Sequence, residues 1–356
     1  MLKSNSGSTG RGDTRPDLRI QMAIIDTLEL RLAEEQSLAP GRSRAYRSLW
    51  VKLRCGPLWG HGEAIADPID EPLRELRSLH LLGESVFDLP RILEPIEHPA
   101  ARAAIDLALH DLIGKAHRLP LRHWRGLPRR LVPVALSLGH LSPSELIEKI
   151  RRFLRADYSV WKFVLGPDTD AALLRALRSE IGSSARYWVD AHQGWTDTLT
   201  QRLAPVLRDT GALFIKQPLP GEQLREYRSL RPRLGLPIIL DEAVVTPADV
   251  IRAVRAEGID GIDVNLSKCG GVVETLRCIE VARAAGLMVQ LSGCAEGQVS
   301  TSAAAHLQGL VDYLDLDESR YVQSKPHFRG ASEEGRLLRP ATIPGNGARL
   351  SDCTRS

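Results

Sequence analysis

The pattern of hydrophobic and polar positions changes near Pro133, and a repeated unit follows. Short apolar segments there alternate with segments whose apolar residues recur at helical spacing, such as 143–156 and 272–286. The apolar segments are 132–139, 159–166, 185–191, 212–217, 236–242, 261–267, 287–293 and 313–317. Strands that alternate with helices predict parallel βα units, and eight strands favour a closed TIM-type (β/α) barrel in an α/β protein.

An open, doubly wound sheet is the alternative for the same segments. Its dinucleotide-binding version would need a glycine-rich phosphate loop after the first strand, and none follows residue 139. The strand count therefore favours the barrel.

The chain before this repeat has a different pattern. Segments 22–33 and 48–56 alternate like antiparallel strands, whereas 71–83 and 98–121 have helical spacing. This part is predicted to form a separate α+β unit. Residues 1–20 are polar and rich in glycine and serine without an apolar core, which predicts a disordered tail rather than a secretory signal.

Charged and amide side chains stand at or just beyond the ends of the predicted strands. They are Lys162, Asp190, His192, Lys216, Asp241, Glu242, Asn265, Lys268, Glu296, Asp315 and Asp317. Catalytic groups of such barrels come from the C-terminal strand ends, and burying this much charge would be costly without a function. Any single one of these residues could instead be an ordinary loop residue.

The composition limits the kinds of binding partner that the protein is expected to have. The 356 residues carry a formal net charge of only +3, with 43% hydrophobic and 26% charged residues, as in an ordinary globular protein. That charge gives no reason to expect nucleic acid or a membrane surface as partner, and no apolar run is long enough to span a bilayer. The five cysteines form no CxxC pair, which suits the cytoplasm and argues against a zinc site.

Several short stretches, taken in order, resemble the enolase superfamily in its muconate-lactonizing and mandelate racemase-like branch, nearest to dipeptide epimerases. The stretches are "GHGEA", "HPAARAAIDLALHDLIGK", "VDAHQGW", "QPLP", "LDEAV", "NLSKCGG", "CAEG" and "DLD", within about 22–350. The resemblance implies a capping domain at 21–131, a modified barrel at 132–325, and a segment at 326–356 that returns to the cap and ends loosely. It also implies removal of a proton next to a carboxylate, with Mg²⁺ stabilising the enediolate.

Three positions depart from the pattern that the resemblance implies. Lys162 is retained from the usual Lys-x-Lys, but Val164 stands at the proton-abstracting lysine and Asn265 at the opposing one. A two-base epimerisation needs a titrating group on each face of the substrate carbon. Valine and asparagine do not supply one, so the standard mechanism is not expected here.

The third departure concerns the metal. The resemblance makes Asp190 and Asp241 metal ligands, with Lys216 in place of the carboxylate between them, about one βα unit from each. An ammonium there would supply positive charge and repel a divalent cation, so we expect Lys216 to replace Mg²⁺. In the alternative, Lys216 points to solvent, and Asp190, Asp241 and Glu242 hold a weakly bound ion.

The substrate side of the site is retained. The resemblance assigns Asp315 and Asp317 to a substrate ammonium group and Lys162 to its carboxylate, with Glu296 as a further substrate-binding residue. Together they predict a zwitterionic small molecule as ligand, although the two aspartates could be loop carboxylates.

The replacement catalytic groups are a separate question. His192 follows Asp190 by two, so on a strand both would face the same way, and imidazole titrates near neutral pH. Lys268 is the second candidate and Lys162 the retained lysine. His140 is weaker, and Cys294 has no assignable histidine partner.

The leading hypothesis is a divergent superfamily member that binds or acts on an amino-acid-like or dipeptide-like carboxylate, by isomerase or lyase chemistry starting at the α-carbon. The alternative is a catalytically inactive scaffold for a ligand or partner. A sugar-acid dehydratase is a weaker third option, because "DLD" argues against it. The oligomeric state stays open, a homo-oligomer included.

Overall fold

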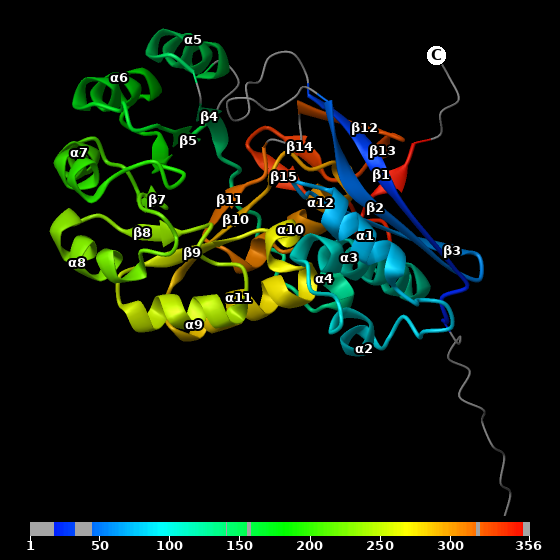
Figure 1. The fold of residues 1–356 in the computed structure, drawn as a ribbon. Helices are drawn as coiled ribbons and strands as arrows, with labels where there is room; N and C mark the ends of the chain where they lie inside the picture. Colours follow the sequence, from blue (N-terminus) through cyan, green and yellow to red (C-terminus); the bar gives the residue numbers. More distant parts are fainter. Residues whose placement is uncertain (1–17, 33–44, 140, 155–157, 318–320, 352–356) are drawn as a thin grey trace, which may run out of the picture.

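The computed structural model describes residues 18–32, 45–139, 141–154, 158–317 and 321–351, and Figure 1 shows their arrangement. An antiparallel sheet and its helices form the cap. The sheet has the order β12-β1-β2-β3. Its strands are β1 (Met22–Leu32), β2 (Ala45–Cys55), β3 (Leu58–Ala64) and β12 (Val322–Lys325).

Two expected boundaries of the cap were wrong. Leu18 and Ile20 were assigned to the disordered tail, but both are buried in the cap core, and the Ile20 amide donates to the Glu84 carbonyl at 2.9 Å. Burial of their apolar side chains is the reason that they are ordered. The strand β12 was expected in the barrel, but it pairs with β1 and so extends the cap sheet.

The helix α3 (Pro99–His117) covers the cap sheet. It begins at a proline, and the His98 side chain accepts a hydrogen bond from the Ala100 amide. The helix lies so close to β3 that a Cβ on Gly62 would stand 1.8 Å from the Ala104 carbonyl oxygen, so only glycine fits there. The other cap helices are α1 (Asp70–Ser78), α2 (Leu89–Leu93) and α4 (Leu121–Trp124).

The second unit confirms the predicted barrel. Eight parallel strands follow one another in the order β11-β10-β9-β8-β7-β6-β5-β4. A bridge between Val134 and Leu314 joins the first and last strand regions and nearly closes the barrel. The strands are β4 (Leu136–Gly139), β5 (Val160–Val164), β6 (Arg186–Asp190), β7 (Ile215–Lys216), β8 (Ile238–Leu240), β9 (Gly261–Val264), β10 (Met288–Ser292) and β11 (Tyr313–Asp315).

The barrel helices lie outside these strands, in green to orange in Figure 1. Their apolar faces and the outward side chains of the strands form the largest hydrophobic core. The helices are α5 (Pro143–Leu154), α6 (Ala171–Ile181), α7 (Asp197–Asp209), α8 (Leu224–Leu234), α9 (Pro247–Ala256), α10 (Leu266–Cys269), α11 (Val272–Ala284), α12 (Gln298–Ala305) and the 3₁₀ helix η1 (Gln308–Leu310). None of the described helices is long and apolar enough to cross a membrane.

The barrel interior has an apolar layer and a polar layer. The apolar layer is a cluster of Ala135, Val160, Trp188, Phe214 and Ile239, against which Tyr313 packs. Side chains alternate along a strand, so the residues two positions further on also face inward. These form a polar ring of Ser137, Lys162, Asp190, Lys216, Asp241, Asp263, Gln290 and Asp315.

The C-terminal segment runs back to the cap. Its short strands are β13 (Phe328–Arg329), β14 (Ser332–Glu334), β15 (Leu337–Arg339) and β16 (Arg349–Leu350). Asn346 anchors it, because its amide donates to Asp111 of α3 at 3.0 Å and its side chain donates to the His61 carbonyl at 2.9 Å.

Candidate functional site

The polar ring has a centre at the Lys216 ammonium, at the end of β7. Its Nζ lies 2.8 Å from Asp190 Oδ2, 2.6 Å from Asp241 Oδ2 and 3.0 Å from Asp263 Oδ2. We call these four residues the cation cage. Lys216 is 3% exposed, so it points into the barrel and not to solvent.

Charges in the cage stabilise one another. Burial alone would lower the pKa of Lys216, but Asp190, Asp241 and Asp263 outweigh it and hold that pKa well above its usual value. Burial likewise opposes ionisation of Asp241, yet Lys216 and Lys268 keep its pKa below the ordinary range. For Asp263 burial prevails and raises the pKa to about 7. The lysine therefore stays protonated at neutral pH.

Lys268, a predicted catalytic residue, supports the cage from α10. Its Nζ donates to Asp241 Oδ1 at 2.5 Å and to the carbonyl oxygens of Asp241 and Asp263 at 2.8 and 2.9 Å. Burial would lower the pKa of Lys268, but Asp241 and Asp263 raise it above its usual value. An ammonium held this firmly is a poor base at neutral pH.

A second ion pair occupies the opposite part of the ring. Lys162 Nζ lies 2.6 Å from Asp315 Oδ2, and the two side chains are only 6% and 1% exposed. The Ser137 hydroxyl donates to Asp315 Oδ1 at 2.7 Å, and the Ser137 amide donates to Asp317 Oδ2 at 2.8 Å. The predicted substrate contacts Lys162, Asp315 and Asp317 therefore lie together and pair within the barrel.

The expectation that His192 faces the same way as Asp190 was wrong. The strand β6 ends at Asp190, and His192 lies in the following turn with a left-handed backbone (φ 46°). Its Nδ1 lies 2.6 Å from Glu242 Oε1, and its side chain is 61% exposed. The contact with the Glu242 carboxylate raises the pKa of His192 against the opposing effect of burial. Glu242 thus pairs with a histidine at the rim.

Glu296 lies beneath the cap. Its Oε1 accepts a hydrogen bond from the Ser267 hydroxyl at 2.6 Å, and burial, together with the nearby Glu63, raises its pKa to about 7. Glu63 comes from β3 and accepts from the Gly297 amide, at the start of α12, at 2.8 Å. Cap and barrel therefore meet at two buried acidic side chains.

The two positions where the resemblance implied lysines have other roles. Asn265 is the N-cap of α10, because its Oδ1 accepts from the Lys268 amide at 2.9 Å, while its Nδ2 donates to the Ser292 carbonyl at 3.1 Å. Val164 ends β5. His140 lies outside the described residues.

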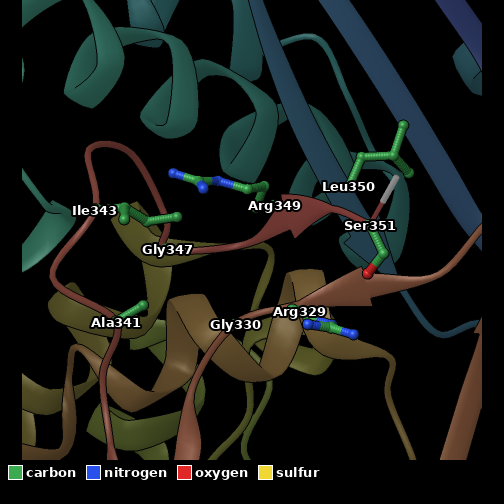
Figure 2. A pocket seen from close by; sticks show the side chains of 8 residues that line it. All are labelled: Arg329, Gly330, Ala341, Ile343, Gly347, Arg349, Leu350 and Ser351. Carbon is green, nitrogen blue, oxygen red and sulfur yellow. The ribbon is translucent and has the colours of Figure 1, made fainter. Parts of the chain in front are cut away.

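A cleft of about 460 Å³ lies away from these residues, in the C-terminal segment. In Figure 2, Arg349 extends from β16 toward Ile343, and Arg329 comes from the facing strand β13. None of the polar ring residues lines it. The barrel mouth thus remains the candidate site.

Comparison with known proteins identifies the family. The family model described as "Enolase C-terminal domain-like" matches residues 145–352. The chain belongs to the enolase superfamily. It is 33% identical over 258 residues to the hydrophobic dipeptide epimerase of Roseobacter litoralis, covering 71% of this chain and 74% of that protein. A hydrophobic dipeptide epimerase of Flavobacteria bacterium is 30% identical over 299 residues, which cover 82% and 84%.

Solved structures of this superfamily agree with the fold. A dipeptide epimerase from Methylococcus capsulatus, complexed with Mg and the dipeptide L-Arg-D-Lys, has a TM-score of 0.84 at 27% identity. The match covers 93% of this chain and 99% of that chain. A dipeptide epimerase from Enterococcus faecalis, complexed with Mg and L-Leu-L-Tyr, has a TM-score of 0.85 at 25% identity and the same coverage.

The residues of this superfamily member do not fit Mg²⁺ as they stand. Within the described ranges, no three histidine, cysteine, aspartate or glutamate side chains are grouped so that they could hold a metal ion. Lys216 stands between the carboxylates of Asp190 and Asp241 instead. An ammonium there repels a divalent cation and fills the space it would need.

Sequence reasoning missed three residues of the site: Ser137, Asp263 and Gln290. Each stands inside a strand and not at its end, so the search for strand-end residues passed over it. The available signal was position, because each follows an inward-facing apolar or glycine residue by two.

Proposed function

We propose that the protein binds a zwitterionic, dipeptide-like carboxylate at the barrel mouth, without the two-lysine proton exchange that the resemblance implies. The observation that carries this proposal is the buried pair of Lys162 and Asp315, 2.6 Å apart. Support comes from the dipeptide epimerases to which the chain is similar.

The ligand class follows from the cost of separating a buried ion pair. A simple anion that took Lys162 would remove the ammonium partner of Asp315, and a simple cation that took Asp315 would remove this carboxylate partner from Lys162. Removing one partner of a buried pair costs about 3–5 kcal/mol. A zwitterion avoids this cost, because its carboxylate replaces Asp315 at the lysine and its ammonium replaces the lysine at Asp315.

The reaction class follows from the titrating groups. Val164 and Asn265 have no side-chain group that titrates near neutral pH, and the Lys268 ammonium donates to three oxygens, which keeps it protonated. Asp263 and Glu296 both have a pKa raised to about 7, but Asp263 is paired with Lys216, so Glu296 is the acid–base group better suited to proton transfer at neutral pH. The reaction that suits one such group is isomerase or lyase chemistry starting at the α-carbon, without inversion by two bases.

A scaffold without turnover is the second candidate. It is favoured by one observation: Lys162, Lys216 and Lys268 each pair with a carboxylate of the barrel itself. Such a protein would bind the zwitterion and leave its α-proton in place.

Incubation with Ala-Glu-type dipeptides in deuterated water, followed by proton NMR and chiral chromatography, tests both candidates. Calorimetry first establishes binding. We expect binding without interconversion of the two epimers. Loss of the α-proton signal without inversion would identify the one-base enzyme, and an unchanged signal the scaffold. Interconversion would contradict the proposal, since another pair of bases would then be present.

A further inference from the structure

We propose that the Lys216 ammonium is a built-in replacement for a divalent cation, and that Asp263 is the third carboxylate that makes this replacement stable. The proposal concerns the cation cage alone. It goes beyond the proposed function, because it holds whichever ligand binds at Lys162 and Asp315.

The Lys216 ammonium finds acceptors for its N–H donors inside the cage. A lysine ammonium has three N–H donors and no acceptor. Lys216 Nζ donates to Asp241 Oδ2 at 2.6 Å and to Asp263 Oδ2 at 3.0 Å, and Asp190 Oδ2 lies 2.8 Å away as an ion-pair partner. Without Asp263, one donor of a fully buried ammonium would lose its carboxylate partner, which is costly.

Two negative charges, on Asp241 and Asp263, lie next to each other in the cage. The strands β8 and β9 pair Leu240 with Ile262, so the next residues, Asp241 and Asp263, stand side by side. Like charges directly opposite each other on neighbouring strands are destabilising. Lys216 contacts both side chains and Lys268 contacts Asp241, so cations separate the two carboxylates. Asp263 therefore belongs to a site built around a cation.

The Lys216 ammonium stands where the ends of neighbouring barrel strands meet. Its carboxylates come from β6, from the end of β8 and from β9, and Lys216 itself comes from β7 between them. Two of the solved dipeptide epimerases with this fold are complexes with Mg. In this chain a positive charge is supplied by the polypeptide, so it does not depend on the concentration of free metal.

The geometry predicts what remains when the ammonium is removed. Three carboxylate oxygens would surround a vacated position, and divalent cations prefer such hard oxygen ligands. Calcium with oxygens at about 2.3–2.6 Å needs less contraction of the cage than magnesium at about 2.0–2.1 Å. The Lys216→Ala variant should therefore gain affinity for divalent cations, for Ca²⁺ and Mn²⁺ as well as Mg²⁺.

The test uses calorimetry and thermal unfolding with no organic ligand present. We expect the wild-type protein to show no saturable heat and no rise in melting temperature with Mg²⁺, Mn²⁺ or Ca²⁺. We expect Lys216→Ala to show both, with a melting temperature that rises with metal concentration. In Lys216→Ala/Asp263→Asn, the metal affinity should fall at least tenfold relative to the single variant.

Lys115→Ala is the matched control. Lys115 also pairs with a buried carboxylate, Asp111, at 2.6 Å, but in the cap. The Lys115→Ala substitution should lower the stability of the protein without any gain in metal binding.

Two outcomes would overturn the proposal: saturable binding of Mg²⁺ by the wild-type protein, or a folded Lys216→Ala variant that binds no divalent cation. If Lys216→Ala does not fold with or without metal, the wild-type titration alone decides. Failure of dipeptides to bind would contradict the proposed function and leave this inference untouched, because no dipeptide enters the experiment.

Discussion

The two halves of the polar ring, around Lys216 and around Lys162, neutralise buried charge in different ways. Around Lys216, one ammonium holds the carboxylates of three strands, and Lys268 adds a second positive charge from α10. Around Lys162, the ammonium pairs with Asp315, to which the Ser137 hydroxyl also donates a hydrogen bond. The first half is a network of three carboxylates around one ammonium, and the second is built on the ion pair of Lys162 with Asp315.

The difference between the halves indicates which ion pair a ligand can replace. A ligand that displaced Lys216 would have to satisfy three carboxylates at once, which no small zwitterion can do. A ligand that enters between Lys162 and Asp315 needs only one group of each charge. We therefore interpret the Lys216 half as the fixed electrostatic frame of the site, and the Lys162 half as its binding surface.

The largest expected effect comes from removing each ammonium in turn. Breaking a buried ion pair costs about 3–5 kcal/mol. Lys216→Met should reach the upper part of that range in metal-free buffer, because it leaves three carboxylates without their shared ammonium, whereas in Lys162→Met the carboxylate of Asp315 keeps its hydrogen bond from Ser137. Adding Asp263→Asn to Lys216→Met should recover part of the loss. Urea denaturation measures all three variants, and equal losses for the two lysines would remove the distinction between the halves.

Glu296 provides a third arrangement, since its partner is the Ser267 hydroxyl and not an ammonium. Its pKa rises from 4.5 to about 7 on folding. Between these values the folded state holds a proton that the unfolded chain has lost, so this group makes stability fall as the pH rises from about 4.5 to about 7. The fall is on the order of 3 kcal/mol, at ~1.4 kcal/mol per unit.

The Glu296→Gln variant should remove this part of the pH dependence. Denaturation of variant and wild type at a series of pH values measures the difference. Parallel curves would mean that Glu296 ionises normally in the folded protein.

Ligand affinity tests the Lys162 half of the polar ring. A charge-assisted hydrogen bond contributes about 1.5–3 kcal/mol. Asp315→Asn/Asp317→Asn should therefore weaken binding of a free-amine dipeptide by roughly tenfold or more. An N-acetylated dipeptide has no ammonium to lose and should bind no worse, because Lys162 is then released for its carboxylate. Calorimetry with both ligands gives the answer; equal losses would make the aspartates structural supports.

The smallest effect is expected at the rim. Glu242 raises the pKa of His192. In Glu242→Gln, that pKa should return toward the ordinary value of about 6.5. NMR titration of the imidazole measures this pKa. The Glu242→Gln substitution should not change the difference in stability between the Lys216→Met and Lys162→Met variants. An unchanged His192 pKa would show that the ion pair at the rim does not form in solution.

The barrel was predictable because its signal is local. Eight apolar segments separated by amphipathic helices can form few folds other than a barrel. The structure has these eight strands in parallel, with the main hydrophobic core between strands and helices. The meeting of Lys216 with Asp190 and Asp241 was also predictable, since consecutive parallel strands bring equivalent positions together.

The remaining features depend on information that the pattern lacks. His192 was misplaced because the backbone leaves the strand at Asp190 and turns through a left-handed conformation, which alternation does not register. Asp263 was missed because it stands inside its strand and not at the end; only its position two residues after Gly261 indicated that it faces inward. The pairing of Lys162 with Asp315 depends on strands far apart in sequence, joined by a bridge at Val134.

The most direct test of this account is a crystal structure of the wild-type protein soaked with MgCl₂ and a free-amine dipeptide. We predict that Lys216 Nζ remains among Asp190, Asp241 and Asp263 without a metal ion, while the dipeptide carboxylate lies at Lys162 and its ammonium at Asp315. A magnesium ion coordinated by Asp190 and Asp241, with Lys216 displaced, would contradict it.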